Sequence, residues 1–426
     1  MPEWSPAANV TFAAWKRTLA DVYTRHGFVP LETAAIERDE ILAAKVGPAT
    51  QKQIYRVIHG STSQSLRFDL TVPLARYVAA HQSELTFPYR RALIDRSWRG
   101  ERAQAGRFRE FYQADADVIG RGSLDHTYDA QILAVAADAL RALQLGRFQI
   151  QISHRGLLMG FLHSLHLLDE AAVIQLLDDA PKIGLSKLKS ELQLLRLDTF
   201  EIRHLLQFAN VTGDLATFSQ AMLRLDIADP DFEAALQELA ELDANLRALG
   251  LHPDEYQFNS GIIRGLDYYT GVVFETILTD HPQIGAICSG GRYDNLVSGF
   301  ASEKMPGVGC SIGLTRLFSQ ALALGLITPS RASVADVVVL PLTDQHDRVA
   351  QLATQLRAAG AAVDVYWQPA ALKKQLRYAD ATGAPWALLV GDDELAADRY
   401  TLKNMISGEQ TSATVAQIAA LVQTRE

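Results

Sequence analysis

An arginine-rich segment is the part of the sequence best suited to binding an anion. Residues 90–109 contain no lysine but seven arginines, namely Arg90, Arg91, Arg96, Arg99, Arg102, Arg107 and Arg109. A surface that serves only solubility has no reason to exclude lysine, whereas bidentate binding of phosphate or carboxylate favours the planar guanidinium group. We therefore interpret the segment as an anion site; the alternative is a solvated basic face.

A strand with one polar face follows directly. In RFREFYQADADVIG the even positions are mostly apolar, and the odd positions include Arg107, Arg109, Gln113, Asp115 and Asp117. Because side chains alternate along a strand, the polar residues share a face. Gln113 and Asp117 are four residues apart, about 13 Å at ~3.3 Å per residue. That gap suits a ligand of amino-acid size and is too wide for one metal ion; the competing interpretation is the polar outer face of a half-buried sheet.

The segment GIIRGLDYYTGVVFET carries an arginine and two tyrosines where a plain core strand would carry valines. It is predicted to form a strand, a glycine interruption and a second strand, with Arg264, Tyr268 and Tyr269 among its residues. Strand alternation would place Tyr268 on the Arg264 face and Tyr269 on the opposite face.

A second polar junction is predicted near residue 70. In SLRFDLTVPLARYVAAH, Thr71 is expected to cap a helix that has Pro73 in its tolerant first turn. Asp69 and Thr71 would then lie where a strand meets a helix N-terminus, a suitable place for a polar ligand.

Two glycine patterns suggest other activities. GCSIG, residues 309–313, matches the G-x-S-x-G nucleophile elbow of α/β-hydrolases, and His346 follows it in the chain. Five-residue patterns of small residues are common, however, and no parallel βαβ series precedes this one. The glycines of residues 307–313 also approach a dinucleotide fingerprint, but the last gap is one residue too long. No G-x-x-x-x-G-K-[ST] loop occurs, so any ATP site must be of another kind.

The order of predicted elements indicates several regions. A helix is expected around residues 12–22 and a hairpin around residues 60–64, and the pattern from about 157 to 251 is helical and poor in strands. Strands resume up to about residue 296, followed by a helix over 311–326 and a linker rich in small residues. The last ninety or so residues alternate strand and helix, which predicts an α/β domain with a largely parallel sheet.

Length and composition set broad limits. The chain has 426 residues, which suggests two or three domains, and its 48% hydrophobic and 21% charged residues fit a folded globular protein. We expect no membrane span and no secretory signal. The only cysteines, Cys288 and Cys310, argue against a disulfide framework or a zinc site and favour a reducing cytoplasm. With a net charge of −9, the whole molecule is no obvious nucleic-acid binder, although local patches decide such contacts.

With these parts in view, the chain resembles the histidyl-tRNA synthetases, a family of class II aminoacyl-tRNA synthetases, over nearly its whole length. The segments that carry the resemblance are, in chain order, RFDLTVPLARYVA, SWRGERAQAGRFREFYQADADVIG, RGLDYYTGVVFE, SGGRYDNL, GVGCSIGLTRL and LKKQLRYADATGAPWALLVG. The resemblance departs at Ala34, where the family usually has proline, and at Ala103 and Ala105, where proline and lysine are common. These departures concern dimer-interface detail and contacts with the tRNA acceptor end.

The resemblance implies a fold and a reaction. The fold would be α/β (α+β): a class II antiparallel-sheet catalytic domain over residues 1–328, with a helical insertion at about 157–251, and an anticodon-binding α/β domain over 335–426. Histidine and ATP would give histidyl-adenylate and pyrophosphate, and the acyl group would pass to tRNA(His). A homodimer in the cytoplasm and Mg²⁺ on the outer phosphates are expected, with no metal held by protein ligands.

The resemblance also implies roles for single residues. Arg99 would hold the α-phosphate and the histidine carboxylate, with Arg264 supplying charge beside the α-phosphate; Glu101 would bind the adenine amino group, and Arg107 and Arg316 the outer phosphates. The candidates for the histidine ammonium are Asp69, Thr71 and Gln113, and those for the imidazole are Asp117 and Tyr269, with Tyr268 lining the pocket. Gly290 and Gly291 would let backbone approach the ligand. Lys373, Lys374 and Arg377 are candidates for tRNA contact, with ordinary solvated helix charge as the alternative.

Three other functions are open at this point. One is a non-catalytic, histidine-binding regulatory subunit of ATP phosphoribosyltransferase, against which the arginines and the C-terminal domain argue. Another is a class II synthetase for a different amino acid, such as proline or threonine. The third is the hydrolase suggested by Ser311.

Overall fold

The computed structural model describes residues 1–43, 51–59, 62–101, 106–167, 169–263, 268–301, 303–329 and 331–423. The chain forms two compact units, one made of Met1 and residues 16–327 and the other of residues 2–15 and 328–426. None of the helices in the described parts of the chain combines the length and the hydropathy of a transmembrane segment.

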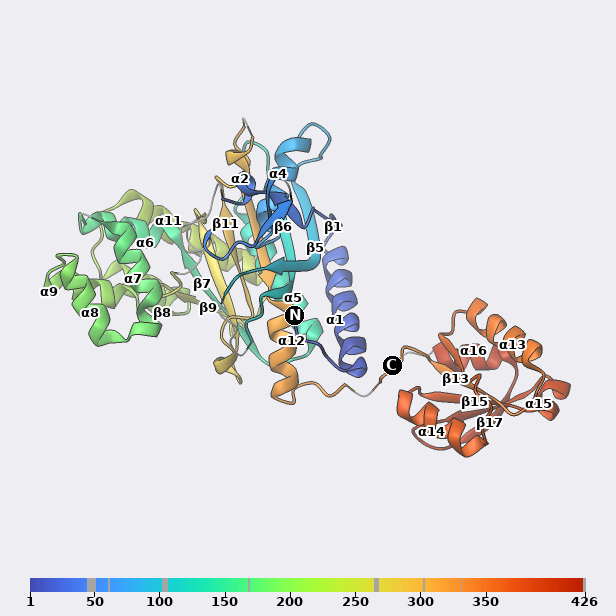
Figure 1. The fold of residues 1–426 in the computed structure, drawn as a ribbon. Coiled ribbons are helices and arrows are strands. Elements are labelled where there is room, and N and C mark those ends of the chain that lie inside the picture. Colours follow the sequence, from blue (N-terminus) through green and yellow to red (C-terminus); the bar gives the residue numbers. More distant parts are fainter. Residues whose placement is uncertain are drawn as a thin grey trace. The chain divides into compact units, whose positions relative to one another are not determined.

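A large sheet is the framework of the first unit. Its nine described strands follow the order β1-β5-β6-β12-β11-β10-β7-β9-β8 (Figure 1). Neighbouring strands are antiparallel, apart from the parallel pairs β1 with β5 and β7 with β9. This arrangement confirms the expected antiparallel sheet. The strands are β1 (Val29–Pro30), β5 (Tyr89–Trp98), β6 (Glu110–Ile119), β7 (Phe148–His154), β8 (Thr212–Gly213), β9 (Tyr256–Asn259), β10 (Val272–Leu278), β11 (Cys288–Tyr293) and β12 (Gly307–Ile312).

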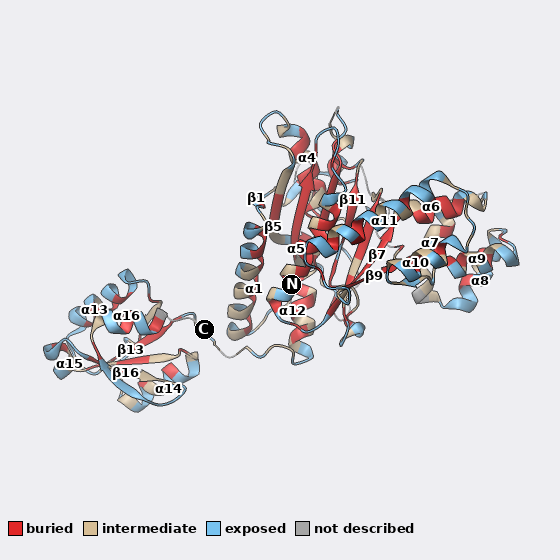
Figure 2. Cartoon of the chain, turned by 180° about the vertical axis from the view of Figure 1, so that it is seen from behind, coloured by how far each residue is buried: buried red, intermediate tan, exposed pale blue. Residues whose placement is uncertain are grey.

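Helix packing buries one side of the central strands, whose residues are largely buried in Figure 2. Helix α5 (Thr127–Leu143) packs on β6, β11 and β12, and alanines such as Ala130 and Ala136 let it approach closely. Tyr23, on α1, donates a hydrogen bond of 3.0 Å to the backbone carbonyl of Ala114 on β6. The other elements of this part are α1 (Pro6–Arg25), α4 (Thr71–His81), α12 (Leu314–Ala323) and the 3₁₀ turns η1 (Pro282–Ile284) and η2 (Val297–Gly299).

A smaller sheet contains the predicted hairpin. Its strands β2 (Ile36–Arg38), β4 (Thr62–Leu66) and β3 (Arg56–His59) are antiparallel, and α2 (Asp39–Ala43) follows β2. The hairpin is confirmed, but β4 begins at Thr62, earlier than expected, and turn residues 60–61 lie outside the described residues.

The predicted cap of α4 is wrong. Thr71 is the first residue of the helix, and the Asp69 carboxylate accepts the free backbone N–H of Val72 at 3.1 Å. Asp69 can do this because a carboxylate near a helix N-terminus satisfies an unpaired donor and interacts favourably with the helix dipole.

Helices fill the region between β7 and β9, where a strand-poor segment was predicted. Aspartates Asp169, Asp198, Asp214 and Asp229 accept backbone N–H groups at the starts of four of them, as strong N-cap residues do. The helices are α6 (Arg155–Ser164), α7 (Glu170–Ile183), α8 (Leu185–Leu194), α9 (Thr199–Phe208), α10 (Leu215–Leu223) and α11 (Pro230–Ala248), with the short β8 among them.

The second unit contains a sheet buried on both faces. Alternate residues of β13 enter two different cores: Val337 and Val339 pack with α13 and α16 residues, and Val338 and Leu340 pack with α14 residues. The strands are β13 (Val337–Pro341), β14 (Val363–Val365), β15 (Trp386–Val390), β16 (Tyr400–Asn404) and β17 (Gln410–Ala413), and the helices are α13 (His346–Ala358), α14 (Leu372–Thr382), α15 (Asp392–Ala397) and α16 (Val415–Gln423).

The prediction of a largely parallel sheet in this unit is wrong. In the order β14-β13-β15-β16-β17 the first two pairings are parallel and the last two antiparallel. The cause is chain length: only residues 391–399 separate β15 from β16, and a parallel crossover needs a dozen or more residues.

Candidate active site

One pocket of the first unit contains most of the predicted site residues. It has a volume of about 520 Å³, within the range of small-molecule sites. Strands β6, β11 and β12, the start of α4 and the start of α12 contribute to its wall. The predicted residues that line it are Asp69, Thr71, Arg99, Glu101, Arg107, Gln113, Asp117, Tyr268, Tyr269 and Arg316. Arg264 lies outside the described residues, as do Ala103 and Ala105.

Asp117, one of the residues that line the pocket, belongs to a buried ion pair. Arg91 on β5 is paired in register with Asp117 on β6, and its Nη1 lies 3.3 Å from Asp117 Oδ2. The Tyr293 hydroxyl donates to Asp117 Oδ1 at 2.7 Å. Burial raises the pKa of Asp117, and Arg91 and Tyr293 oppose that rise. The pair therefore keeps a fixed acceptor group in this part of the pocket wall, which we call the acidic end.

Two more carboxyl groups belong to the acidic end. Burial, followed by the charge of Asp117, raises the pKa of Asp115 to about 8. Burial also raises the pKa of Asp69 to about 6, opposed by the Val72 N–H and by Arg99. Several buried carboxyl groups close together favour the binding of a cationic ligand.

Tyr268 and Tyr269, in the segment GIIRGLDYYTGVVFET, line the same pocket. The prediction that they lie on opposite faces of a strand is therefore wrong. Residues 268–270 are not in a strand, and β10 begins only at Val272. The two hydroxyl oxygens are 3.4 Å apart, and the Tyr268 ring meets Tyr293 edge-on at 6.2 Å. Burial raises the pKa of each phenol, so both stay protonated and can donate hydrogen bonds.

The glycines near the pocket make room for its own side chains. A Cβ on Gly309 would overlap the Asp117 carboxylate, and one on Gly291 would lie 3.0 Å from Tyr269 Cδ1. Gly290 also lines the pocket, so its expected role of letting backbone approach a ligand stays a prediction.

Arginines also line the pocket, and we call the part of the wall that contains Arg99, Arg107 and Arg316 the basic end. Arg99 donates to the Phe68 carbonyl at 3.0 Å and lies over the Phe111 ring, 5.2 Å from its centroid. Arg107 pairs with Glu101 at 3.4 Å, with 45% and 26% of their side chains exposed. Arg316, in the first turn of α12, donates to the Ile284 carbonyl.

The arginine-rich segment divides between different tasks. Arg99 and Arg107 line the pocket, and Arg91 supports Asp117 from behind. Arg96, by contrast, pairs with Glu110 at 3.1 Å on the surface, and Arg90 stacks over Tyr128. Anion binding therefore stays a prediction for Arg99 and Arg107, whereas Arg90, Arg91 and Arg96 contact other side chains of the protein.

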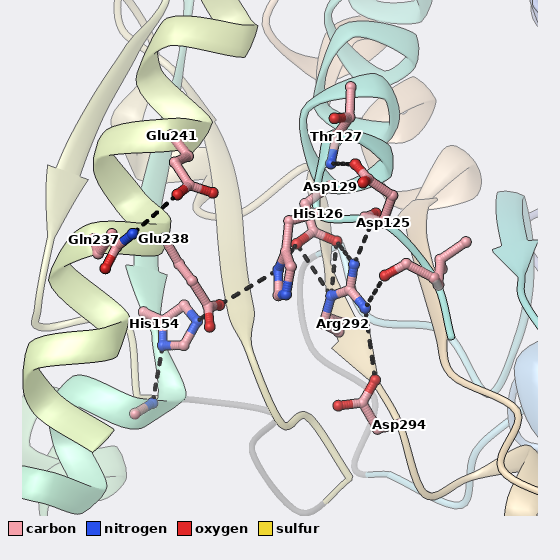
Figure 3. A network of polar contacts seen from close by, with 12 residues as sticks. Asp125, His126, Thr127, Asp129, His154, Gln237, Glu238, Glu241, Arg292 and Asp294 are labelled. Carbon is pink, nitrogen blue, oxygen red and sulfur yellow. Dashed lines mark hydrogen bonds and ion pairs between the residues drawn. The ribbon is translucent and has the colours of Figure 1, made fainter. Parts of the chain in front are cut away.

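A polar network surrounds Arg292 (Figure 3), and Arg292 also contacts the segment that follows the two tyrosines. Arg292 on β11 donates to the Asp129 carboxylate from Nε at 3.0 Å and to the carbonyls of Leu124 and Asp125 at 3.1 Å. That segment lies on Arg292: Thr270 N–H donates to the Arg292 carbonyl at 2.8 Å, and Gly271 leaves room for the arginine stem. Sequence reasoning did not assign Arg292, although its segment SGGRYDNL was singled out.

The same network reaches the inserted helices. Glu238 on α11 accepts from His154 at 2.9 Å and lies 3.4 Å from His126, between the two rings in Figure 3. The pKa of Glu238 is lowered chiefly by its hydrogen bond to His154, and that of His126 is raised chiefly by Asp129. Charged contacts therefore join α11 to β7 and to the start of α5.

The structure contradicts the hydrolase interpretation. Ser311 lies within strand β12 instead of at a strand-to-helix turn, and its hydroxyl accepts from Gln113 Nε2 at 2.8 Å. No histidine is among the described residues that line the pocket.

The three tRNA candidates lie on one helix of the second unit. Lys373, Lys374 and Arg377 are exposed on α14, while Gln375 and Ala379 of the same helix are buried.

Comparisons with known proteins agree over both units. The family model described as histidyl-tRNA synthetase matches residues 2–317, and the anticodon binding domain model matches residues 336–425. A histidine–tRNA ligase of Clostridium tetani is 40% identical over 99% of this chain and 96% of its own length, and one of Finegoldia magna is 37% identical over 96% and 95%. Among solved structures, histidyl-tRNA synthetase from Nostoc sp. PCC 7120 matches with a TM-score of 0.88 and 36% identity, covering 100% of this chain and 98% of that one.

Proposed function

The chain belongs to the histidyl-tRNA synthetase family, and on this premise we propose how its residues carry out the ATP-dependent ligation of histidine to tRNA. The reaction has two steps, formation of histidyl-adenylate with release of pyrophosphate and transfer of the acyl group to the tRNA 3′ end. One observation carries the assignment of the site: a single pocket is lined both by buried carboxyl groups and by partly exposed arginines. Histidine offers a cation and ATP a polyanion, so the two ends match the two substrates.

In the first step the substrate itself supplies the nucleophile. The histidine carboxylate attacks the α-phosphorus, so no enzyme nucleophile is required. The protein must position two anions and stabilise charge that grows on the phosphoryl oxygens. We assign Arg99 and Arg264 to the α-phosphate region, with Arg99 also holding the histidine carboxylate; the lining position of Arg99, next to Asp69, supports its part.

The rest of the nucleotide is assigned to the basic end. Arg107 and Arg316 take the β- and γ-phosphates, and Glu101 the adenine amino group. Arg107 and Glu101 pair with each other at 3.4 Å, so this ion pair has to open when Arg107 binds phosphate and Glu101 binds the adenine amino group. Mg²⁺ would be held mainly by phosphate oxygens and would neutralise their charge; Glu275 in the pocket wall offers a compatible oxygen donor.

Histidine selection is assigned to the acidic end. Asp69, Thr71 and Gln113 take the ammonium group, and Asp117 and Tyr269 take the imidazole, with Tyr268 closing the side of the pocket. Asp117 keeps acceptor capacity, since each carboxylate oxygen has two lone pairs and one hydrogen bond. A site that bonds both ring nitrogens rejects an isostere strongly, because its buried groups would be left unpaired.

The partner and assembly assignments rest on the family. We place the anticodon-binding domain at 335–426 and the catalytic domain at 1–328, with tRNA(His) contacting Lys373, Lys374 and Arg377. A cytoplasmic homodimer is part of the proposal, and light scattering of the purified protein tests the dimer.

ATP–pyrophosphate exchange measured with each of the twenty amino acids tests the function. Exchange should depend on histidine alone, and dependence on another amino acid would overturn the assignment. The regulatory-subunit alternative predicts no exchange at all. Against it, the anticodon-domain model matches the C-terminal residues, and Arg99 and Arg316 line the pocket.

A further inference from the structure

Two buried acceptor atoms of the acidic end have no partner among the described residues. They are Oε1 of Gln113 and Oδ1 of Asp115, in side chains that are only 7% and 1% exposed. A buried acceptor without a donor costs free energy, so a bound donor, whether a water molecule or a ligand, would stabilise such an atom. Both residues line the pocket.

Ser311 holds these two side chains together. It is the direct cross-strand partner of Asp115 in the β6–β12 register, and its hydroxyl accepts from Gln113 Nε2. A hydrogen bond from Ser311 also favours the ionised form of Asp115. Because Gln113 turns its N–H group toward Ser311, its carbonyl oxygen stays available for a donor.

The nearby charges determine which donor fits. Asp69, Asp115 and Asp117 are close enough to influence each other's ionisation, and the buried Arg91 is already hydrogen-bonded to Asp117. Burial, followed by the charge of Asp117, raises the pKa of Asp115 to about 8, and the charge of Arg91 offsets this rise only in part. A ligand cation with more than one N–H donor would satisfy both free oxygens and the charge.

We propose that Asp115, positioned by Ser311, is a further ligand of the ammonium group of the amino-acid substrate, beside Gln113. The inference rests on the proposed function and extends it to two residues that it leaves unassigned. The ammonium group donates one N–H to Asp115 Oδ1 and another to Gln113 Oε1. Asp117 differs, since both of its oxygens already accept hydrogen bonds from Tyr293 and Arg91.

Substrate fragments separate this role from recognition of the ring. Histamine keeps the ammonium and imidazole groups, whereas 3-(imidazol-4-yl)propionate keeps the imidazole and lacks the ammonium. In histidine-dependent exchange, Asp115→Asn should raise the histidine KM and the inhibition constant of histamine by about 10- to 100-fold, the loss of a hydrogen bond to a charged group. The inhibition constant of imidazolylpropionate and the KM of ATP should change less than about twofold.

Ser311→Ala gives an independent measurement. It should raise the histidine KM by about three- to tenfold with kcat retained, as expected of a positioning residue whose neutral hydrogen bond is lost. Asp243→Asn is the matched control, because Asp243 is a buried carboxyl group on α11 that does not line the pocket; its histidine KM should stay unchanged.

The outcomes are distinct. Equal weakening of both fragments by Asp115→Asn, or weakening of neither, would overturn the ammonium assignment. Thermal melting shows whether a variant is folded, and if Asp115→Asn is not, the same fragment comparison on Ser311→Ala decides. A wild-type protein without histidine-dependent exchange would instead overturn the proposed function itself.

Discussion

The two ends of the pocket are built differently. At the acidic end, Asp115 and Asp117 lie in the middle of β6, buried and paired in register with β12 and β5. At the basic end, Arg107 is 45% exposed and precedes the strand, and Arg316 extends from the first turn of a helix. The acidic groups are fixed by strand pairing, whereas the arginines keep the mobility of long, partly solvated side chains.

The difference suggests where specificity and catalysis reside. A rigid, desolvated set of acceptors can reject ligands by leaving polar groups unpaired, so the acidic end suits the choice of amino acid. Guanidinium groups need only reach the phosphates and stabilise charge as it develops, which long side chains can do after ATP has bound. The predictions below test this division, from the largest expected effect to the smallest.

Breaking the buried ion pair should damage the acidic end most. Arg91→Ala leaves Asp117 buried without its cation and should lower the free energy of unfolding of the first unit by about 3–5 kcal/mol. Urea unfolding followed by fluorescence measures it. Arg96→Ala is the control, since that exposed pair with Glu110 should contribute about 1 kcal/mol or less. Similar losses for the two variants would show that the acidic end is not specially fixed.

Removing charge at the α-phosphate should affect chemistry without affecting stability. Arg264→Ala is expected to slow adenylate formation by about 10²- to 10³-fold, the scale of one lost transition-state donor. Arg264→Lys should rescue poorly because a point charge lacks the guanidinium fork. Pre-steady-state ATP consumption measures the step, and a rate near that of wild type would remove Arg264 from the mechanism.

A pH series should distinguish the two ends without mutation. The pKa values of about 6 for Asp69 and about 8 for Asp115 mean that these groups ionise as the pH rises, and only ionised carboxylates attract the ammonium group. The histidine KM should therefore fall by about two- to tenfold from pH 7 to 8.5, above the titration of a free imidazole near 6.5. Other groups facing Asp115 are Asp117 and Arg91 and the tyrosines, whose raised pKa values keep them protonated in this range.

The variant Asp115→Asn checks the origin of that pH dependence. In this variant the histidine KM should change little between pH 7 and 8.5. The KM of ATP should vary little with pH in both the wild type and the variant. A histidine KM that is flat in the wild type, or equally steep in the variant, would contradict the assignment.

The smallest effect is expected for a residue of the second unit, which is not part of the pocket wall. Lys374→Ala on α14 should weaken tRNA binding a few-fold and reduce the slope of log affinity against log salt by about 1. Filter binding at several salt concentrations measures both. Histidine-dependent exchange, which needs no tRNA, should be unchanged, and a loss there would indicate an effect on folding.

Several site residues could be predicted because their signals are local. The alternation of RFREFYQADADVIG placed Gln113, Asp115 and Asp117 on one face, and β6 has that face in the pocket. The two-tyrosine segment was located but its conformation was predicted wrongly, because it resembles a strand in composition and yet residues 268–270 are not in a strand. The capping role of Asp69 was assigned to Thr71, since the sequence does not reveal which oxygen reaches the free N–H.

By itself the sequence indicated the helical insertion through its periodicity, and its motifs carried the resemblance that implied the family, the antiparallel catalytic sheet and most of the pocket residues. These signals can be read from the sequence because they depend on residues close in the chain. Only the tertiary structure decided that Arg91 neutralises Asp117, that Ser311 lies beside Asp115, and that the C-terminal sheet is mixed. Those facts depend on strand register and connection length, which bring together residues as far apart as 115 and 311, and no local pattern encodes that pairing.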